Sequence, residues 1–135
     1  FFLLNKILKM SRTVFSRLSL SAVSGRRAFS EVSNIADLAT FRTFVESGPS
    51  VSYFTASWCG PCRQIAPVYS ELAKANGEIK FSKIDIDEAK DIAEKMKIRS
   101  VPTFFFFGKD GKLAFTFSGA DTKMLEEGLG KIKSE

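Results

Sequence analysis

The sequence predicts an α/β fold with a mixed central sheet, in which parallel strands and a C-terminal antiparallel hairpin are flanked by helices. From residue 31 onward, strand-like runs alternate with helical patterns, which is typical of parallel strands joined by helical crossovers. Residues 109–112 read KDGK, a hairpin turn, so the last two strands are expected to be antiparallel. The unbroken run Phe104–Phe107 indicates a strand buried on both faces.

The first half of the domain follows this alternation. Asp37 marks a helix start, because aspartate caps helices and Phe41 and Val45 follow at helical spacing. Residues 50–56, SVSYFTA, are β-branched and aromatic and predict a buried strand. The next amphipathic segment ends at Gly77. We therefore expect strands at 32–35 and 50–56, and helices from 37 to a stop at 47–49 and from about 61 to 76.

The second half adds a strand, a helix, the hairpin and a closing helix. Residues 79–87 alternate in hydropathy, which predicts a strand. Residues 88–97 carry Ala89, Ile92 and Met96 at helical spacing. Gly119 breaks the chain before the final helix. We therefore expect strands at 79–87, 103–107 and 113–117, and helices at 88–97 and 121–133.

The basic charge of the chain lies in a leader. Residues 1–30 contain six Lys or Arg and no acid, whereas residues 31–135 hold 14 basic and 15 acidic residues. This Ser- and Arg-rich composition predicts an organelle transit peptide over residues 1–29, with residues 1–9 upstream of an initiator Met10 and a domain at 30–135. We expect the mitochondrial matrix, with plastid or cytosol as alternatives. A near-neutral domain without a long apolar run predicts neither nucleic-acid nor membrane binding.

Both cysteines of the chain lie in the stretch ASWCGPCRQ, residues 56–64. Structural zinc sites use four ligands, usually Cys and His, and this chain has two Cys and no His. A metal site would therefore need carboxylates as further ligands, or a dimer that pools four Cys around zinc or an iron–sulfur cluster. A structural bridge between Cys59 and Cys62 would close a very small loop and constrain the unfolded chain little. The remaining interpretation is a reactive pair.

The local pattern favours the reactive pair. Cys59 lies between a strand and a helix, and Pro61 suits the first helical turn. Unpaired N–H groups at a helix start favour a thiolate, which is the nucleophilic form of cysteine. Trp58 is expected to be a cover or docking platform beside the thiol; a core position is the alternative.

At this point the chain resembles the thioredoxin family, over about residues 31–135. The segment Trp58–Cys62, WCGPC with Gly60 and Pro61 between the cysteines, matches the active-site motif of that family, and Pro67 and Val101–Thr103 match in spacing. The resemblance implies the thioredoxin fold, a cis bond before Pro102, and a substrate groove formed by Trp58, Gly60, Pro61, Val101, Pro102 and Gly119. It also implies that Cys59 attacks a client disulfide and that Cys62 resolves the mixed disulfide.

One position departs from the family. The buried Asp usually found six residues before the first cysteine is Tyr53 here, while Lys83 matches the family lysine near it. A phenol with a reference pKa of about 10 is a poor base, so the group that deprotonates Cys62 stays open between water, Lys83 and a substrate group. The segment Tyr53–Ala56 resembles mitochondrial o-type thioredoxins of plants.

The resemblance further implies a protein-disulfide reductase that binds no cofactor and receives electrons from NADPH through a thioredoxin reductase. Its partners would be that reductase and client proteins with disulfides, and we expect a monomer. The alternative is a non-catalytic thioredoxin-fold binding subunit or a cluster-bridged dimer.

Overall fold

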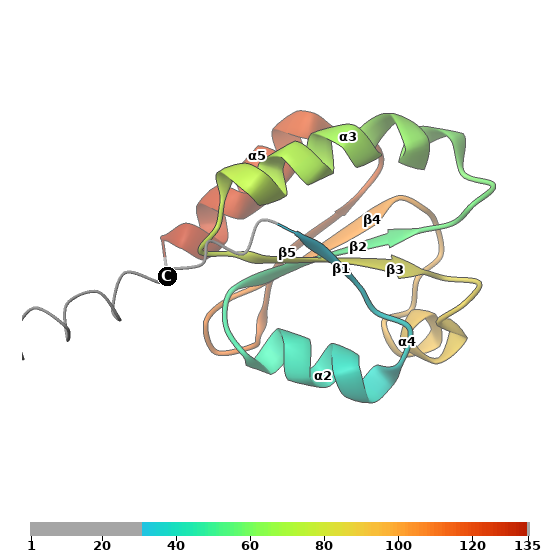
Figure 1. Ribbon diagram of the computed structural model, residues 1–135, viewed down its shortest axis with the longest axis horizontal. Helices are drawn as coiled ribbons and strands as arrows, with labels where there is room; N and C mark the ends of the chain where they lie inside the picture. The colour runs from blue at the N-terminus through green and yellow to red at the C-terminus, as the bar shows by residue number, and fades with distance from the viewer. Residues whose placement is uncertain (1–30, 135) are drawn as a thin grey trace, which may run out of the picture.

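The computed structural model describes residues 31–134. These residues form a five-stranded mixed sheet with helices on both faces (Figure 1). The predicted transit peptide, its Met10 initiator and the domain start at residue 30 lie outside the described residues. The elements are β1 (Val32–Asn34), α2 (Leu38–Glu46), β2 (Ser50–Thr55), α3 (Gly60–Ala75), β3 (Lys80–Asp85), α4 (Lys90–Lys95), β4 (Thr103–Phe107), β5 (Leu113–Ser118) and α5 (Thr122–Lys133).

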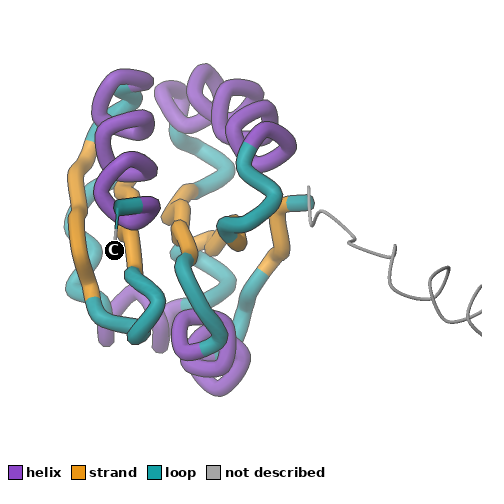
Figure 2. Tube along the Cα trace, turned by 90° about the vertical axis from the view of Figure 1, so that its left-hand side faces the viewer, coloured by secondary structure: helices purple, strands orange, loops and turns teal. Residues whose placement is uncertain are grey.

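The sheet has the strand order β1-β3-β2-β4-β5. Strand β3 pairs in parallel with β1 and β2, whereas β4 pairs antiparallel with β2 and β5. This confirms the mixed sheet and its antiparallel C-terminal hairpin. Helices α3 and α5 cover one face of the sheet and α2 and α4 the other, as Figure 2 shows in a view turned from that of Figure 1.

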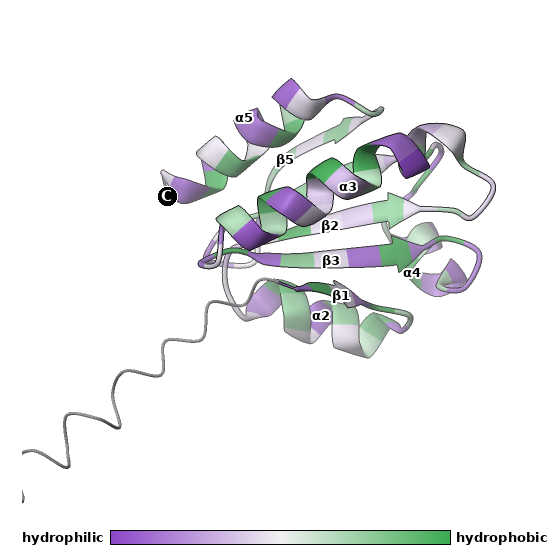
Figure 3. Cartoon of the chain, turned by 45° about the horizontal axis from the view of Figure 1, so that its top comes forward, coloured by the Kyte–Doolittle hydropathy of each residue, from purple (hydrophilic) through white to green (hydrophobic). Residues whose placement is uncertain are grey.

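Alternation along the central strands divides the core in two. Tyr53, Phe104 and Phe106 belong to the core beneath α3 and α5. Phe54 and Phe105 belong to the core beneath α2 and α4. The aromatic run therefore fills both cores, as its unbroken hydropathy predicted, and each fully buried ring contributes about 1.5–3 kcal/mol. Figure 3 shows hydrophilic and hydrophobic residues mixed along α3 and α5, as expected for helices that cover a sheet.

Aspartate side chains cap two helix starts, at the predicted start Asp37 and at Asp121, which was predicted as the first residue of its helix. The Asp37 side chain accepts a hydrogen bond from the Thr40 amide at 2.8 Å, and Asp121 accepts from the amides of Lys123 and Met124. Both residues are therefore N-caps one position outside their helices. No helix within residues 31–134 has the length and apolar character needed to cross a membrane.

Two predicted elements are shorter than the hydropathy pattern suggested. The strand predicted at 79–87 ends at Asp85, because its carboxylate accepts the amide of Asp87 at 2.9 Å and turns the chain. The helix predicted at 88–97 spans Lys90–Lys95. It ends before Lys97, whose φ of 54° lies in the left-handed region typical of helix C-termini.

Candidate active site

The two cysteines lie at the junction of β2 and α3. Cys59 and Cys62 form a disulfide, with their Cα atoms 5.3 Å apart. Both residues are buried, at 3% and 2% exposure, whereas Gly60 and Pro61 between them are exposed. Pro61 occupies the first turn of α3, where its missing N–H leaves no helical hydrogen bond unmade. The motif therefore folds as the sequence predicted, with one cysteine before the helix and the other inside it.

The Cys59 sulfur is the N-cap of α3. Its backbone is extended, and its Sγ accepts a hydrogen bond from the Cys62 amide at 3.2 Å. Amide N–H groups at a helix start carry partial positive charge, which stabilises an anion placed there. A thiolate at Cys59 is therefore favoured by the backbone itself, and the thiolate is the nucleophilic form of cysteine.

Trp58 lies on the surface beside the disulfide. It is 64% exposed, and its indole Nε1 donates to Asp87 Oδ2 at 3.0 Å. The alternative of a core tryptophan is therefore wrong. Asp87 follows β3 in sequence, so the hydrogen bond fixes the indole against the loop after a neighbouring strand.

The turn that precedes β4 lies against the disulfide. The Val101–Pro102 peptide bond is cis, as the resemblance implied. The Val101 carbonyl oxygen lies 3.6 Å from Cys59 Sγ. The Gly119 amide donates to the Pro102 carbonyl at 2.9 Å, and its φ of 110° suits glycine alone. The fold thus brings Val101, Pro102 and Gly119 to the cysteine pair from far along the sequence.

Tyr53 supports the helix that carries Cys62. Its hydroxyl donates to the Cys62 carbonyl oxygen at 3.0 Å. Burial raises the pKa of Tyr53, although the neighbouring Thr55 hydroxyl opposes this shift. The phenol therefore keeps its proton at neutral pH and is engaged as a donor, so it is poorly suited to deprotonate Cys62.

A pocket of about 200 Å³ adjoins the cysteine pair, with Cys62 but not Cys59 in its lining. Cys62 lines it together with Tyr53, and Lys83, an exposed residue within β3, lines it as well. Asp85 also lines it and was not predicted from the sequence. The available signal was its place at the carboxyl end of a parallel strand, the edge at which side chains of neighbouring strands meet. The complete lining is Tyr53, Thr55, Ala56, Ser57, Cys62, Arg63, Ala66, Lys83 and Asp85.

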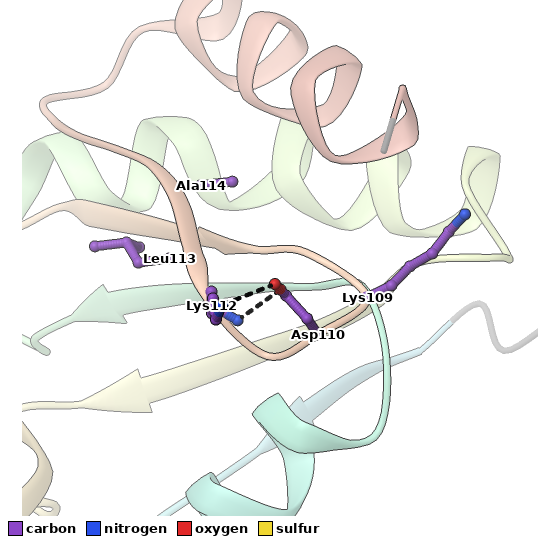
Figure 4. A pocket seen from close by; sticks show the side chains of 5 residues that line it. All are labelled: Lys109, Asp110, Lys112, Leu113 and Ala114. Atoms are coloured by element: carbon purple, nitrogen blue, oxygen red, sulfur yellow. Dashed lines mark hydrogen bonds and ion pairs between the residues drawn. The ribbon is translucent and has the colours of Figure 1, made fainter.

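A wider depression of about 540 Å³ lies on the hairpin between β4 and β5. Figure 4 shows the side chains that line it, including Leu113 and Ala114. Lys112 contacts Asp110 through its amide at 3.0 Å and its Nζ at 3.8 Å, which are local turn contacts. The depression contains neither cysteine, so the cysteine pair and its surroundings remain the candidate site.

Metal coordination was the other chemistry considered for the cysteines. Within residues 31–134, no group of three or more His, Cys, Asp or Glu side chains is placed to hold a metal ion. The site geometry instead matches thiol chemistry, with a disulfide at a helix start, an exposed indole and a cis-proline turn. These features define a thiol–disulfide oxidoreductase.

Comparisons with known proteins give the family. The thioredoxin family model matches residues 32–131. Thioredoxin-3, mitochondrial, of Saccharomyces cerevisiae is 32% identical over 111 residues, covering 82% of this chain and 87% of that protein. The TPR repeat-containing thioredoxin TDX of Arabidopsis thaliana is 46% identical over 84 residues, which are 62% of this chain but 22% of that longer protein. The chain belongs to the thioredoxin family.

Solved structures agree with this assignment. The crystal structure of oxidised mitochondrial thioredoxin 3 from S. cerevisiae superposes with a TM-score of 0.70 at 33% identity, covering 80% of this chain and 99% of that one. Thioredoxin from Trypanosoma brucei brucei superposes with a TM-score of 0.74 at 30% identity, covering 84% of this chain and all of that one, 100%. The predicted thioredoxin fold is therefore confirmed.

Proposed function

We propose that this protein reduces disulfides in client proteins by cycling Cys59 and Cys62 between dithiol and disulfide. The observation that carries the proposal is the Cys59 sulfur at the N-cap of α3, 3.2 Å from the Cys62 amide. This position favours a thiolate at Cys59 rather than at Cys62, whose side chain lies one turn further into the helix.

The reaction has two exchange steps. The Cys59 thiolate attacks one sulfur of the client disulfide, forming a mixed disulfide and releasing the other client sulfur as a thiolate. The Cys62 thiolate then attacks Cys59 Sγ, which forms the Cys59–Cys62 bond and releases the second client thiolate. The client gains two electrons, and the cysteine pair loses two.

The surface around the pair suits an extended client segment. Trp58, Gly60 and Pro61 form one side of it, all three exposed. The backbone of Val101, Pro102 and Gly119 forms the other side; the Pro102 side chain is buried, and the Val101 carbonyl lies 3.6 Å from Cys59 Sγ. Backbone groups at such a turn can pair with an extended segment as a strand edge does, which holds a client disulfide near Cys59.

Electrons would reach the disulfide from NADPH through a thioredoxin reductase, because family members carry electrons without a bound cofactor. The partners are then this reductase and disulfide-containing clients. We propose that the protein acts as a monomer, independently of nucleic acid and membranes.

The mitochondrial matrix is the proposed location. The basic, acid-free leader and the yeast relative named as mitochondrial support it. Plastid and cytosol are the alternatives, and the chain is also similar to thioredoxin H3 of Arabidopsis thaliana, whose name states no mitochondrial location. A fluorescent reporter fused to residues 10–35 should enter mitochondria, and diffuse cytosolic fluorescence would contradict the proposal.

The testing experiment is NADPH-coupled reduction of insulin, with mitochondrial and cytosolic-type thioredoxin reductases compared. The wild-type chain should consume NADPH, faster with the mitochondrial enzyme, and Cys59→Ser should abolish consumption. A wild-type chain that reduces no insulin with either reductase would contradict the proposal. A biological activity that survives in the Cys59→Ser/Cys62→Ser double variant would instead support the non-catalytic binding subunit, because the cluster-bridged dimer would lose its cysteine ligands.

A further inference from the structure

The proposed reaction requires Cys62 to lose its proton, and Tyr53 is a poor acceptor for it. The Tyr53 hydroxyl donates to the Cys62 carbonyl rather than facing the thiol as an acceptor. The proton acceptor must therefore be another group in the pocket that Cys62 lines. The question of which group it is arises from the tyrosine at position 53.

Strand register places four side chains together in that pocket. In the parallel pair β2–β3, Tyr53 lies beside Lys83, and Thr55 lies beside Asp85. Residues two apart on a strand face the same side, so these four side chains share the sheet face beneath the start of α3. All four line the same pocket as Cys62.

Charge and hydrogen-bonding capacity separate the ionisable groups around the pocket. Besides the cysteine, the ionisable residues lining it are Tyr53 from β2, Arg63 from α3, and Lys83 and Asp85 from β3. Guanidinium and ammonium groups are donors without an acceptor site. Among these described lining residues, Asp85 is the one anion, and a carboxylate can accept a proton.

The Asp85 carboxylate is held in place with acceptor capacity left. Its Oδ1 accepts the Asp87 amide at 2.9 Å. A carboxylate offers about four lone-pair sites over two oxygens, so one backbone contact leaves others for water. The pocket volume of about 200 Å³ exceeds the roughly 30 Å³ that one water occupies in the liquid, and its lining is rich in polar groups.

We propose that Asp85 accepts the proton of Cys62, through water in this pocket, when Cys62 attacks the mixed disulfide at Cys59. The Cys62 Sγ–H bond breaks, and its proton passes by way of water to the Asp85 carboxylate. The resulting thiolate forms the bond to Cys59 Sγ, and the client thiolate leaves with the electron pair of the broken disulfide. Asp85 then returns its proton to solvent or to that thiolate. Lys83 stabilises the Cys62 thiolate by its charge.

This inference rests on the proposed disulfide reduction, and the test separates the two. Reduced protein is mixed with dithiobis-nitrobenzoate in a stopped-flow instrument across about pH 6 to pH 8, the range in which a thiol of ordinary pKa is mostly protonated. Attack by Cys59 releases one coloured thiolate, and resolution by Cys62 releases the second. Asp85→Asn removes the proton acceptor but keeps an oxygen that can accept the Asp87 amide. Glu88→Gln is the matched control, since Glu88 lines the neighbouring pocket with Lys83 and Asp85 but not this one.

In Asp85→Asn the second phase should slow about 10²-fold at neutral pH, which is the low end of the rate contribution of a general base. The rate of the first phase, attack by Cys59, should stay the same. The rate of this second phase in Asp85→Asn should rise about tenfold per pH unit, because only the fraction of Cys62 that is already thiolate at that pH can react. The rate should vary less with pH in wild type and in Glu88→Gln. Ala66→Leu, which narrows the pocket from α3 and leaves the Asp85 residue itself unchanged, should slow the same phase.

An unchanged second phase in Asp85→Asn would overturn the assignment of Asp85 and leave the disulfide reduction intact. Equal slowing of both phases would also overturn it, because the effect would then be structural. If Asp85→Asn does not fold, Ala66→Leu decides by the same criteria. A wild-type protein that releases neither thiolate would overturn the proposed function itself.

Discussion

Gly128 lies where α5 crosses β4, in contact with the ring of Phe106. A Cβ atom at this position would lie 2.5 Å from the nearest ring carbon, well inside the roughly 3.5–4.0 Å of an ordinary carbon–carbon contact. Phe106 is fully buried and lies near the rings of Phe115 and Phe117, which limit its movement. Overpacking of this kind costs about 1–3 kcal/mol.

Gly130, two residues further along the same helix, provides the matched control. A Cβ there meets nothing within 4 Å. Replacing either glycine by alanine gains up to about 1 kcal/mol of helix propensity, so this gain largely cancels in the difference between the two variants. Gly130→Ala should therefore be at least as stable as wild type, and Gly128→Ala should be about 1–3 kcal/mol less stable than Gly130→Ala.

Urea titration followed by circular dichroism measures both free energies of unfolding. Equal stability of Gly128→Ala and Gly130→Ala would show that the packing of α5 on Phe106 leaves room for a methyl group at position 128. An unchanged denaturant slope in both variants is needed for the comparison, because the slope reports the surface exposed on unfolding.

Three further predictions concern a buried core tyrosine and the surroundings of the cysteine pair. Burial raises the pKa of Tyr69 well above 10.0, so above about pH 10 the unfolded chain ionises while the folded chain cannot. Stability should then fall by up to about 1.4 kcal/mol per pH unit, and urea titrations of Tyr69→Phe should show a smaller loss. Asp87→Asn should weaken the hydrogen bond from Trp58 and increase acrylamide quenching of the sole tryptophan; unchanged quenching would mean that the contact does not restrain the indole. Pro61→His should raise the reduction potential by about 30 mV or more in glutathione buffers, because a cation at the helix start stabilises the Cys59 thiolate; an unaltered potential would contradict this reasoning.

Much of the fold could be predicted because the signals are local. The alternation of strands and helices, the helix start at Asp37 and the hairpin turn each depend on a few neighbouring residues. The end of α4 was predicted too late because Lys97 adopts a left-handed backbone conformation, which is uncommon for lysine and is not indicated by the sequence.

The cysteine pair could also be predicted from its motif, but the residues that surround it in space could not. Asp85 reaches the pocket because β3 pairs with β2 in a register that sets it beside Thr55. A one-residue slip would turn it to the other face, and a single strand pattern does not specify the partner or the register. The hydrogen bond from Trp58 to Asp87 depends on the same pairing.

The unequal roles of the two cysteines are tested by trapping. Cys59→Ser and Cys62→Ser variants are incubated with an extract of disulfide-containing proteins, and covalent adducts are counted on non-reducing gels. Cys62→Ser should accumulate mixed disulfides that dithiothreitol releases, because Cys59 still attacks and nothing resolves the product. Cys59→Ser should accumulate few, because the N-cap thiolate is lost. Equal trapping by both variants, or trapping by Cys59→Ser alone, would contradict the assignment of attack to Cys59 and resolution to Cys62.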